Sequence, residues 1–157
     1  MGRDRHDFRG RWHPVIISGH DVGHWVAAQI GGFYNEASSQ AIGLERDGEI
    51  VAGVIYESWN GKSITCHIAI ERRISAEFLH VTTNYAFVTC GAYKVIAPVE
   101  SNNHRSVRFV LSIGFVEEGR ILNGCPGGDI MFFTLTADRC KYLQERYGKT
   151  RHTAAYA

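Results

Sequence analysis

Histidine and cysteine side chains can hold a metal or carry redox chemistry, but their spacing in this chain favours neither. The four cysteines are Cys66, Cys90, Cys125 and Cys140. No two of them have the spacing of a zinc knuckle or a CxxC motif. His20 and His24 are four residues apart, but Asp21 is expected to be the N-cap of a helix that starts between them. We therefore predict no metal site and reduced thiols, as in a cytoplasmic protein.

His67 is a titratable side chain in a segment with strand-like character, residues 63–70. Alternate residues of a strand share a face, so Ile68 and Ile70 lie on one face and His67 on the other. The isoleucine face is expected to pack on helices. Histidine exchanges protons near neutral pH, so His67 could be a general base or a hydrogen-bonded structural residue.

Composition limits the class of protein. Lys and Arg number 17 against 16 Asp and Glu, and 45% of the 157 residues are hydrophobic. Such a chain has a core, and its total charge gives no support for nucleic-acid binding. We predict one domain, residues 13–143, between a basic arm at residues 1–12 and a basic tail at residues 144–157. No apolar run is long enough for a membrane span.

Turn signals order the first half of the chain. Residues 14–18 predict a strand, and the apolar spacing from Trp25 to Ile30 predicts a helix. Asp47-Gly48 and Asn60-Gly61 then separate apolar runs, which is typical of hairpins. The three strands joined by these turns are residues 41–46, 49–58 and 63–70.

The apolar period becomes helical after Ser75, which is expected to cap a helix that continues to Cys90. An apolar strand follows at residues 93–99, and Asn103 caps a further helix that ends at Gly114. Residues 115–122 and 129–136 predict a last hairpin. The order β-α-β-β-β-α-β-α-β-β favours the α+β class, with a mixed, mostly antiparallel sheet of six to seven strands.

The stretch from Val99 to Gly119 combines a strand, Asn103, a helix and the run Gly-Phe-Val-Glu-Glu-Gly. It resembles the signature of the GNAT superfamily of acyl-CoA-dependent N-acyltransferases. Shorter stretches, at residues 66–69, 77–79, 84–87 and 115–119, are similar to small phage-encoded members. The resemblance implies a sheet splayed between its fourth and fifth strands, and transfer from acetyl-CoA or another acyl-CoA to the amine of a small molecule or protein. A homodimer is a further expectation.

The resemblance places the pyrophosphate of the acyl-CoA at the helix start near Ser75, where N–H groups and the helix dipole favour an anion. Arg72 and Arg73 add positive charge, whereas Ser75 and Glu77 replace small residues of the family pattern. The residues expected to bind the cofactor are Ile68, Ile70, Arg72, Arg73, Ser75, Asn103 and Ser106.

Val110 stands where many members of the family have a tyrosine that protonates the leaving thiolate, and valine has no proton to donate. Tyr56, Tyr85 or Ser112 could serve instead, or the thiolate leaves without an acid. The catalytic residues that the resemblance implies are His67 or Glu71 as the base and Tyr56 as the acid.

Two other functions remain open from the sequence. One is adenine modification in DNA, as in the GNAT-like Mom proteins of phages, with the basic termini holding the DNA backbone in the host cytoplasm. The unusual phosphate loop and Val110 favour it, and the balanced charge argues against it. The other is a non-catalytic acyl-CoA-binding or interaction domain.

Overall fold

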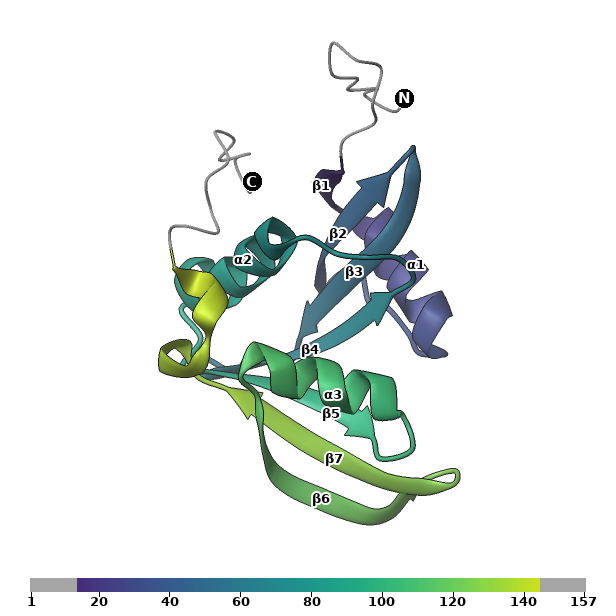
Figure 1. The fold of residues 1–157 in the computed structure, drawn as a ribbon, viewed down its shortest axis with the longest axis vertical. Helices are drawn as coiled ribbons and strands as arrows, with labels where there is room; N and C mark the ends of the chain where they lie inside the picture. Colours follow the sequence, from purple (N-terminus) through teal and green to yellow (C-terminus); the bar gives the residue numbers. More distant parts are fainter. Residues whose placement is uncertain (1–13, 145–157) are drawn as a thin grey trace. The chain divides into compact units, whose positions relative to one another are not determined.

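The computed structural model describes residues 14–144, so the basic arm at residues 1–12 and the tail beyond residue 144 lie outside the described residues (Figure 1). Contacts divide the chain into two compact units, one up to Ile74 and one from Ser75. Within residues 14–144, seven strands and three α-helices follow one another in the predicted order. The predicted α+β class and mostly antiparallel sheet are confirmed.

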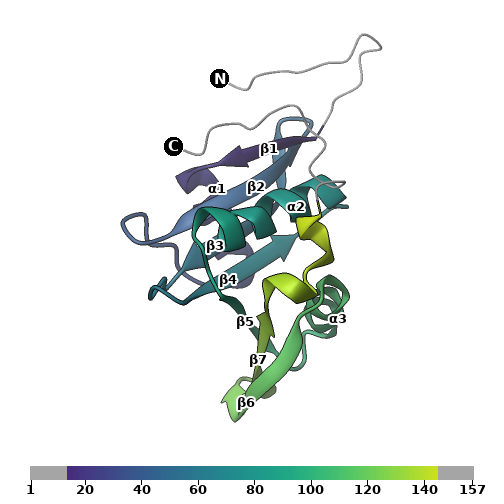
Figure 2. The same cartoon turned by 90° about the vertical axis from the view of Figure 1, so that its left-hand side faces the viewer.

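The first unit contains β1 (Val15–Ser18), α1 (His20–Ile30), β2 (Gln40–Arg46), β3 (Glu49–Glu57) and β4 (Ser63–Ile70). Its strands lie side by side in chain order, each antiparallel to the next (Figure 2). Short turns produce this meander, as predicted. Asp47 and Gly48 both have positive φ, of 52° and 79°, which a two-residue hairpin turn requires.

Two glycines allow α1 to approach the sheet closely. A Cβ at Gly43 would lie 2.8 Å from Val22, and one at Gly53 would lie 2.6 Å from Val26. Gly53 pairs with Ala69, which is buried in the same cluster as the two valines. Since Ala69 and His67 share a face of β4, α1 packs on the face that carries His67. The helix α1 therefore covers the face opposite the isoleucines, and the packing of the isoleucine face on helices stays a prediction.

The start of α1 also differs from the prediction. Gly19, with φ of +133°, is the N-cap, and Asp21 lies inside the first turn, where a negative charge suits the helix dipole. His20 and His24 are consequently both in α1, one turn apart. His20 Nδ1 lies 3.0 Å from the Tyr34 hydroxyl, and His24 Nε2 lies 2.7 Å from Glu36 Oε1.

The second unit contains α2 (Ala76–Asn84), a π-helical turn (Tyr85–Thr89), β5 (Lys94–Glu100), α3 (His104–Ile113), β6 (Val116–Cys125) and β7 (Gly128–Leu135). Its strands have the order β5-β7-β6 and are antiparallel. The helix predicted at residues 75–90 is thus one α-helix continued by a π turn, in which Cys90 N donates to Tyr85 O at 2.9 Å. The separation of β4 from β5 stays a prediction.

The end of α3 matches the sequence pattern. Gly114 has φ of +121°, and a Cβ there would lie 2.3 Å from Arg139 O, so glycine is required for two reasons. Phe115 is buried next to it. The last hairpin is longer than predicted, because Cys125 pairs with Gly128 across a Pro126-Gly127 turn in which Gly127 has φ of +82°.

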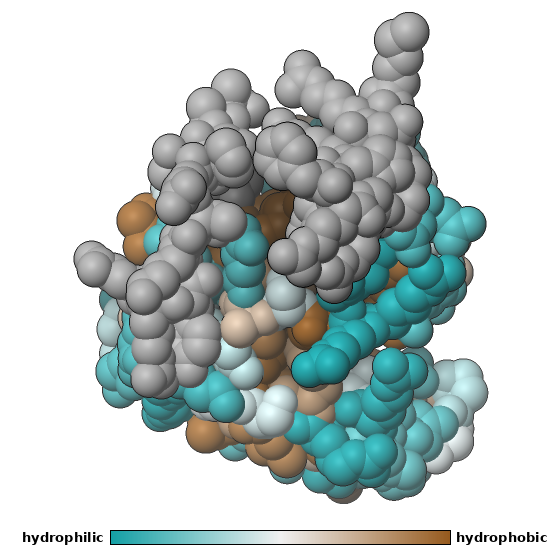
Figure 3. Space-filling view, turned by 45° about the horizontal axis from the view of Figure 1, so that its top comes forward, coloured by the Kyte–Doolittle hydropathy of each residue, from teal (hydrophilic) through white to brown (hydrophobic). Residues whose placement is uncertain are grey.

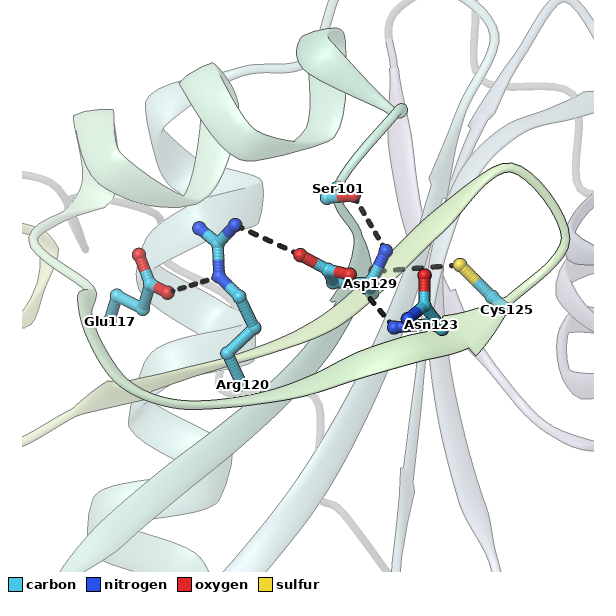
Figure 4. Close-up of polar contacts among 6 residues, drawn as sticks. All are labelled: Ser101, Glu117, Arg120, Asn123, Cys125 and Asp129. Atoms are coloured by element: carbon cyan, nitrogen blue, oxygen red, sulfur yellow. Dashed lines mark hydrogen bonds and ion pairs between the residues drawn. The ribbon is translucent and has the colours of Figure 1, made fainter.

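Asp129 fixes the β6–β7 hairpin to the end of β5 (Figure 4). Its carboxylate accepts from Asn123 N at 2.9 Å and from Arg120 at 3.3 Å. Its backbone N–H donates to Ser101 Oγ at 2.8 Å, and its carbonyl accepts from Ser101 N at 2.9 Å. This network accounts for an aspartate and a serine that carried no signal in the sequence.

Hydrophilic and hydrophobic residues are both present on the molecular face drawn in Figure 3. Among residues 14–144, no helix has the length and apolar character needed to cross a membrane.

Candidate active site

His67 and Glu57 form a pair on one face of the first unit's sheet. In the β3–β4 register His67 lies opposite Ile55, and Glu57 lies opposite Thr65, so the two side chains are diagonal neighbours. His67 Nε2 lies 2.7 Å from Glu57 Oε1, with 27% and 31% of the two side chains exposed. A half-buried imidazole held by a carboxylate is a suitable proton acceptor.

Glu57 was not predicted as a site residue, although the sequence held a signal for it. The Asn60-Gly61 turn sets the register of the hairpin, because Asn60 Oδ1 accepts from the backbone N–H groups of Lys62 and Ser63 at 2.9 and 2.8 Å. Counting outward from that turn places Glu57 and His67 on the same face.

The other two catalytic candidates are not brought to His67. Tyr56 pairs with Cys66 and therefore lies on the opposite face of the sheet, where it is buried. Glu71 follows the end of β4 and is exposed, and its backbone N–H donates to Val51 O at 2.8 Å. The described side-chain partner of His67 is the Glu57 carboxylate, which is suited to proton transfer.

Three arginines gather at the end of β4. Arg72 lies 3.2 Å from the Glu49 carboxylate, and Arg46 Nε donates to the Arg73 carbonyl at 3.2 Å. These contacts are exposed and hold the segment before Ser75 against the β2–β3 hairpin. Surface pairs of this kind are weak, so the Arg72 guanidinium can exchange Glu49 for a phosphate. Arg46 was missed because it is 27 residues from Arg73 in the chain.

Ser75 and Asn103 cap the two helices of the second unit, as predicted. Ser75 Oγ accepts from Phe78 N at 3.1 Å, and Asn103 Oδ1 accepts from Ser106 N at 3.1 Å. The Ser75 hydroxyl keeps its own proton for a further acceptor. Ser106 thus supplies an N–H to its own cap, and its contact with a cofactor stays a prediction.

The remaining candidate residues lie in a strand or a helix and make contacts within it. Ile68 pairs with Val54 and Ile70 with Ala52, so both isoleucines take part in the β3–β4 ladder. Val110, at the position of the expected tyrosine, is buried in α3. The exposed Ser112 donates from Oγ to Phe109 O at 2.6 Å, inside its own helix.

Cys66 is poorly suited to act as a nucleophile. Burial raises the pKa of its thiol to about 12, so the reactive thiolate is scarce at neutral pH. Residues 14–144 contain no group of three His, Cys, Asp or Glu side chains that could hold a metal ion.

Comparison with known proteins places the fold. No family model and no curated protein matches the sequence. A variant of spermidine N-acetyltransferase SpeG from Vibrio cholerae is 13% identical and matches 85% of this chain and 98% of its own, with a TM-score of 0.67. Campylobacter jejuni N-acetyltransferase PseH, solved in complex with acetyl coenzyme A, is 15% identical over 64% of this chain and 70% of its own, with a TM-score of 0.52. A probable acetyltransferase is 18% identical over 64% of this chain and 62% of its own, with a TM-score of 0.55. The chain has the fold of the GNAT acetyltransferases.

Proposed function

We propose that this protein transfers an acyl group, most simply acetyl, from acyl-CoA to an amine. The observation that carries the proposal is the match of 85% of the chain to an N-acetyltransferase over nearly that protein's whole length. The arginines at the end of β4, directly before a capped helix, support it independently, since they are suited to a pyrophosphate.

The acyl-CoA would extend along β4. Arg72, Arg73 and the first turn of α2 bind its phosphates, together with the Ser75 hydroxyl. His67 is five residues from Arg72, which is at most about 17 Å of extended chain. The pantetheine arm must therefore cover this distance for the thioester to react near His67.

In the reaction, His67 removes a proton from the substrate ammonium and passes it to solvent. The amine nitrogen then forms a bond to the thioester carbon, and the carbon–sulfur bond breaks. The second proton on that nitrogen ends on the departing sulfur, which gives an amide and CoA. Val110 cannot protonate the departing sulfur, and the reaction proceeds without an acid there because a thiolate leaves well unaided.

The acceptor class proposed is a small-molecule amine, by analogy with the spermidine on which SpeG acts. The basic termini that could contact DNA lie outside the described residues. DNA modification, a homodimer, a cytoplasmic location and a phage origin stay predictions.

Titration of the purified protein with acetyl-CoA in a calorimeter tests the proposal. The wild type should bind acetyl-CoA, and the double variant Arg72→Ala/Arg73→Ala should bind it roughly tenfold or more weakly, since charge-assisted phosphate contacts are strong. Arg120→Ala, which removes an exposed arginine of the β6–β7 hairpin, is the matched control and should bind normally. A wild type that does not bind acetyl-CoA contradicts the proposal.

A panel of amines, spermidine included, then separates the possible functions. Acetyl-CoA binding without turnover of any amine would favour a non-catalytic acyl-CoA-binding domain. Modified nucleosides in the DNA of cells that express the protein would favour the Mom-like function.

A further inference from the structure

We infer that Glu57 is a positioning residue that holds His67 with its proton on Nε2, so that Nδ1 is the atom that accepts the substrate's proton. The inference rests on the proposed function, and it names both a residue and the reacting atom of the base.

The chemistry of the contact sets the tautomer. An ionised carboxylate only accepts hydrogen bonds, so the 2.7 Å contact between Glu57 Oε1 and His67 Nε2 requires a proton on Nε2. In a neutral imidazole the lone pair is then on Nδ1. Within residues 14–144, Nδ1 makes no hydrogen bond, so this lone pair is available to a substrate.

Burial distinguishes this pair from an ordinary surface ion pair. The chain contains a second histidine–glutamate pair with the same 2.7 Å distance, His24 with Glu36, but 56% of each of those side chains is exposed. His67 and Glu57 are about half as exposed, and Ile55, directly opposite His67, is fully buried. The His67 imidazole has less access to water and is flanked by neighbouring residues of the two paired strands. Both restrict the ring to fewer orientations.

The carboxylate also has a role during proton transfer. When Nδ1 takes the proton from the substrate ammonium, the imidazole becomes a cation that donates from Nε2 to Glu57. The carboxylate faces this new positive charge at hydrogen-bond distance and stabilises it without itself becoming protonated. The proton then leaves Nδ1 for solvent, and the pair returns to its starting state.

The test compares Glu57→Gln with Glu36→Gln, the matched change in the exposed pair, in the full chain. Glutamine keeps the size of Glu57 but can also donate, so the tautomer is no longer fixed. We expect kcat for acetyl transfer to fall roughly tenfold or more in Glu57→Gln, with KM for acetyl-CoA unchanged. Glu36→Gln should have the kcat of the wild type, and Glu57→Asp should recover part of the loss because a carboxylate is still present.

Nitrogen-15 NMR of the imidazole gives a readout that a merely structural role would not move. The neutral His67 ring of the wild type should carry its proton on Nε2, and in Glu57→Gln the two tautomers should be mixed. A wild-type proton on Nδ1 overturns the inference, and so does a folded Glu57→Gln protein with normal kcat. A wild type that acetylates no amine overturns the proposed function first, and the inference with it.

Discussion

Val26 of α1 and Gly53 of β3 are so close that a Cβ at Gly53 would lie 2.6 Å from Val26 Cγ2. Gly53→Ala should therefore destabilise the protein by about 1–3 kcal/mol, the usual cost of forcing extra volume into a packed core. Urea unfolding measures the change. Gly119→Ala is the control, since a Cβ there would have no atom within 4 Å and the variant should unfold like the wild type. Equal stability of Gly53→Ala and the control would contradict the close packing of α1.

The close contact of α1 with β3 could not be predicted from the sequence, whereas the turns and the helix caps could. The Asp47-Gly48 and Asn60-Gly61 turns and the caps at Ser75 and Asn103 act within a few residues, so local patterns predicted them correctly. The choice of face for α1 depends on glycines in two different strands. An alternation pattern treats such glycines as neutral, so it did not predict that α1 packs on the face that carries His67.

Site residues follow the same division. Arg72, Arg73 and Ser75 are consecutive or nearly so and were proposed as site residues from the sequence. Arg46 joins them only through a contact 27 residues away in the chain, which no local pattern contains. Glu57 is intermediate in how readily it can be predicted, because it is ten residues from His67 but the register of one hairpin relates the two.

Glu118 should make the folded protein less stable as the pH falls into the acid range. Hydrogen bonds from Lys94 and Thr134 lower the pKa of its carboxyl group in the folded state. A lowered folded pKa stabilises the protein above the ordinary pKa of glutamate, and this stabilisation is lost as the pH falls through the folded value. Glu118→Gln should thus unfold at lower urea concentration than the wild type at pH 7, and the two should converge once the pH has fallen below the folded pKa of Glu118.

Lys94→Met in the Glu118→Gln background measures how much of the stabilisation comes from the contact between Lys94 and Glu118. If Lys94 acts mainly through Glu118, the second change should cost much less than Lys94→Met alone. Two costs that simply add, or a difference between Glu118→Gln and wild type that persists at low pH, would contradict this account of Glu118.

Cys66 should resist alkylation in the folded protein at pH 7.5. Burial raises its thiol pKa to about 12, so iodoacetamide should leave it unlabelled under conditions that label it fully after denaturation. Peptide mass spectrometry identifies the labelled site. Cys66→Ser should also retain acyl transfer, since in the proposed reaction the amine attacks the thioester directly. A loss of transfer in a folded Cys66→Ser protein would instead favour an acyl-cysteine intermediate.

His67→Ala should lower kcat by roughly two to four orders of magnitude, the usual contribution of a general base. Affinity for acetyl-CoA should change little, because the proposed phosphate site is at the arginines beyond β4. Steady-state kinetics and calorimetry measure the two quantities separately. Glu71→Gln should be tested beside it, because the exposed Glu71 is the rival base. Normal turnover by a folded His67→Ala protein would remove His67 from the mechanism.

The most direct test of acyl transfer counts both products of one reaction. Purified protein is incubated with acetyl-CoA and the amine panel, free CoA is measured by its thiol, and the acetylated amine is measured by mass spectrometry. We predict equal amounts of CoA and acetylated amine, both depending on the amine supplied. CoA released without an acetylated amine, or no CoA above the protein-free rate with any amine, would contradict this prediction.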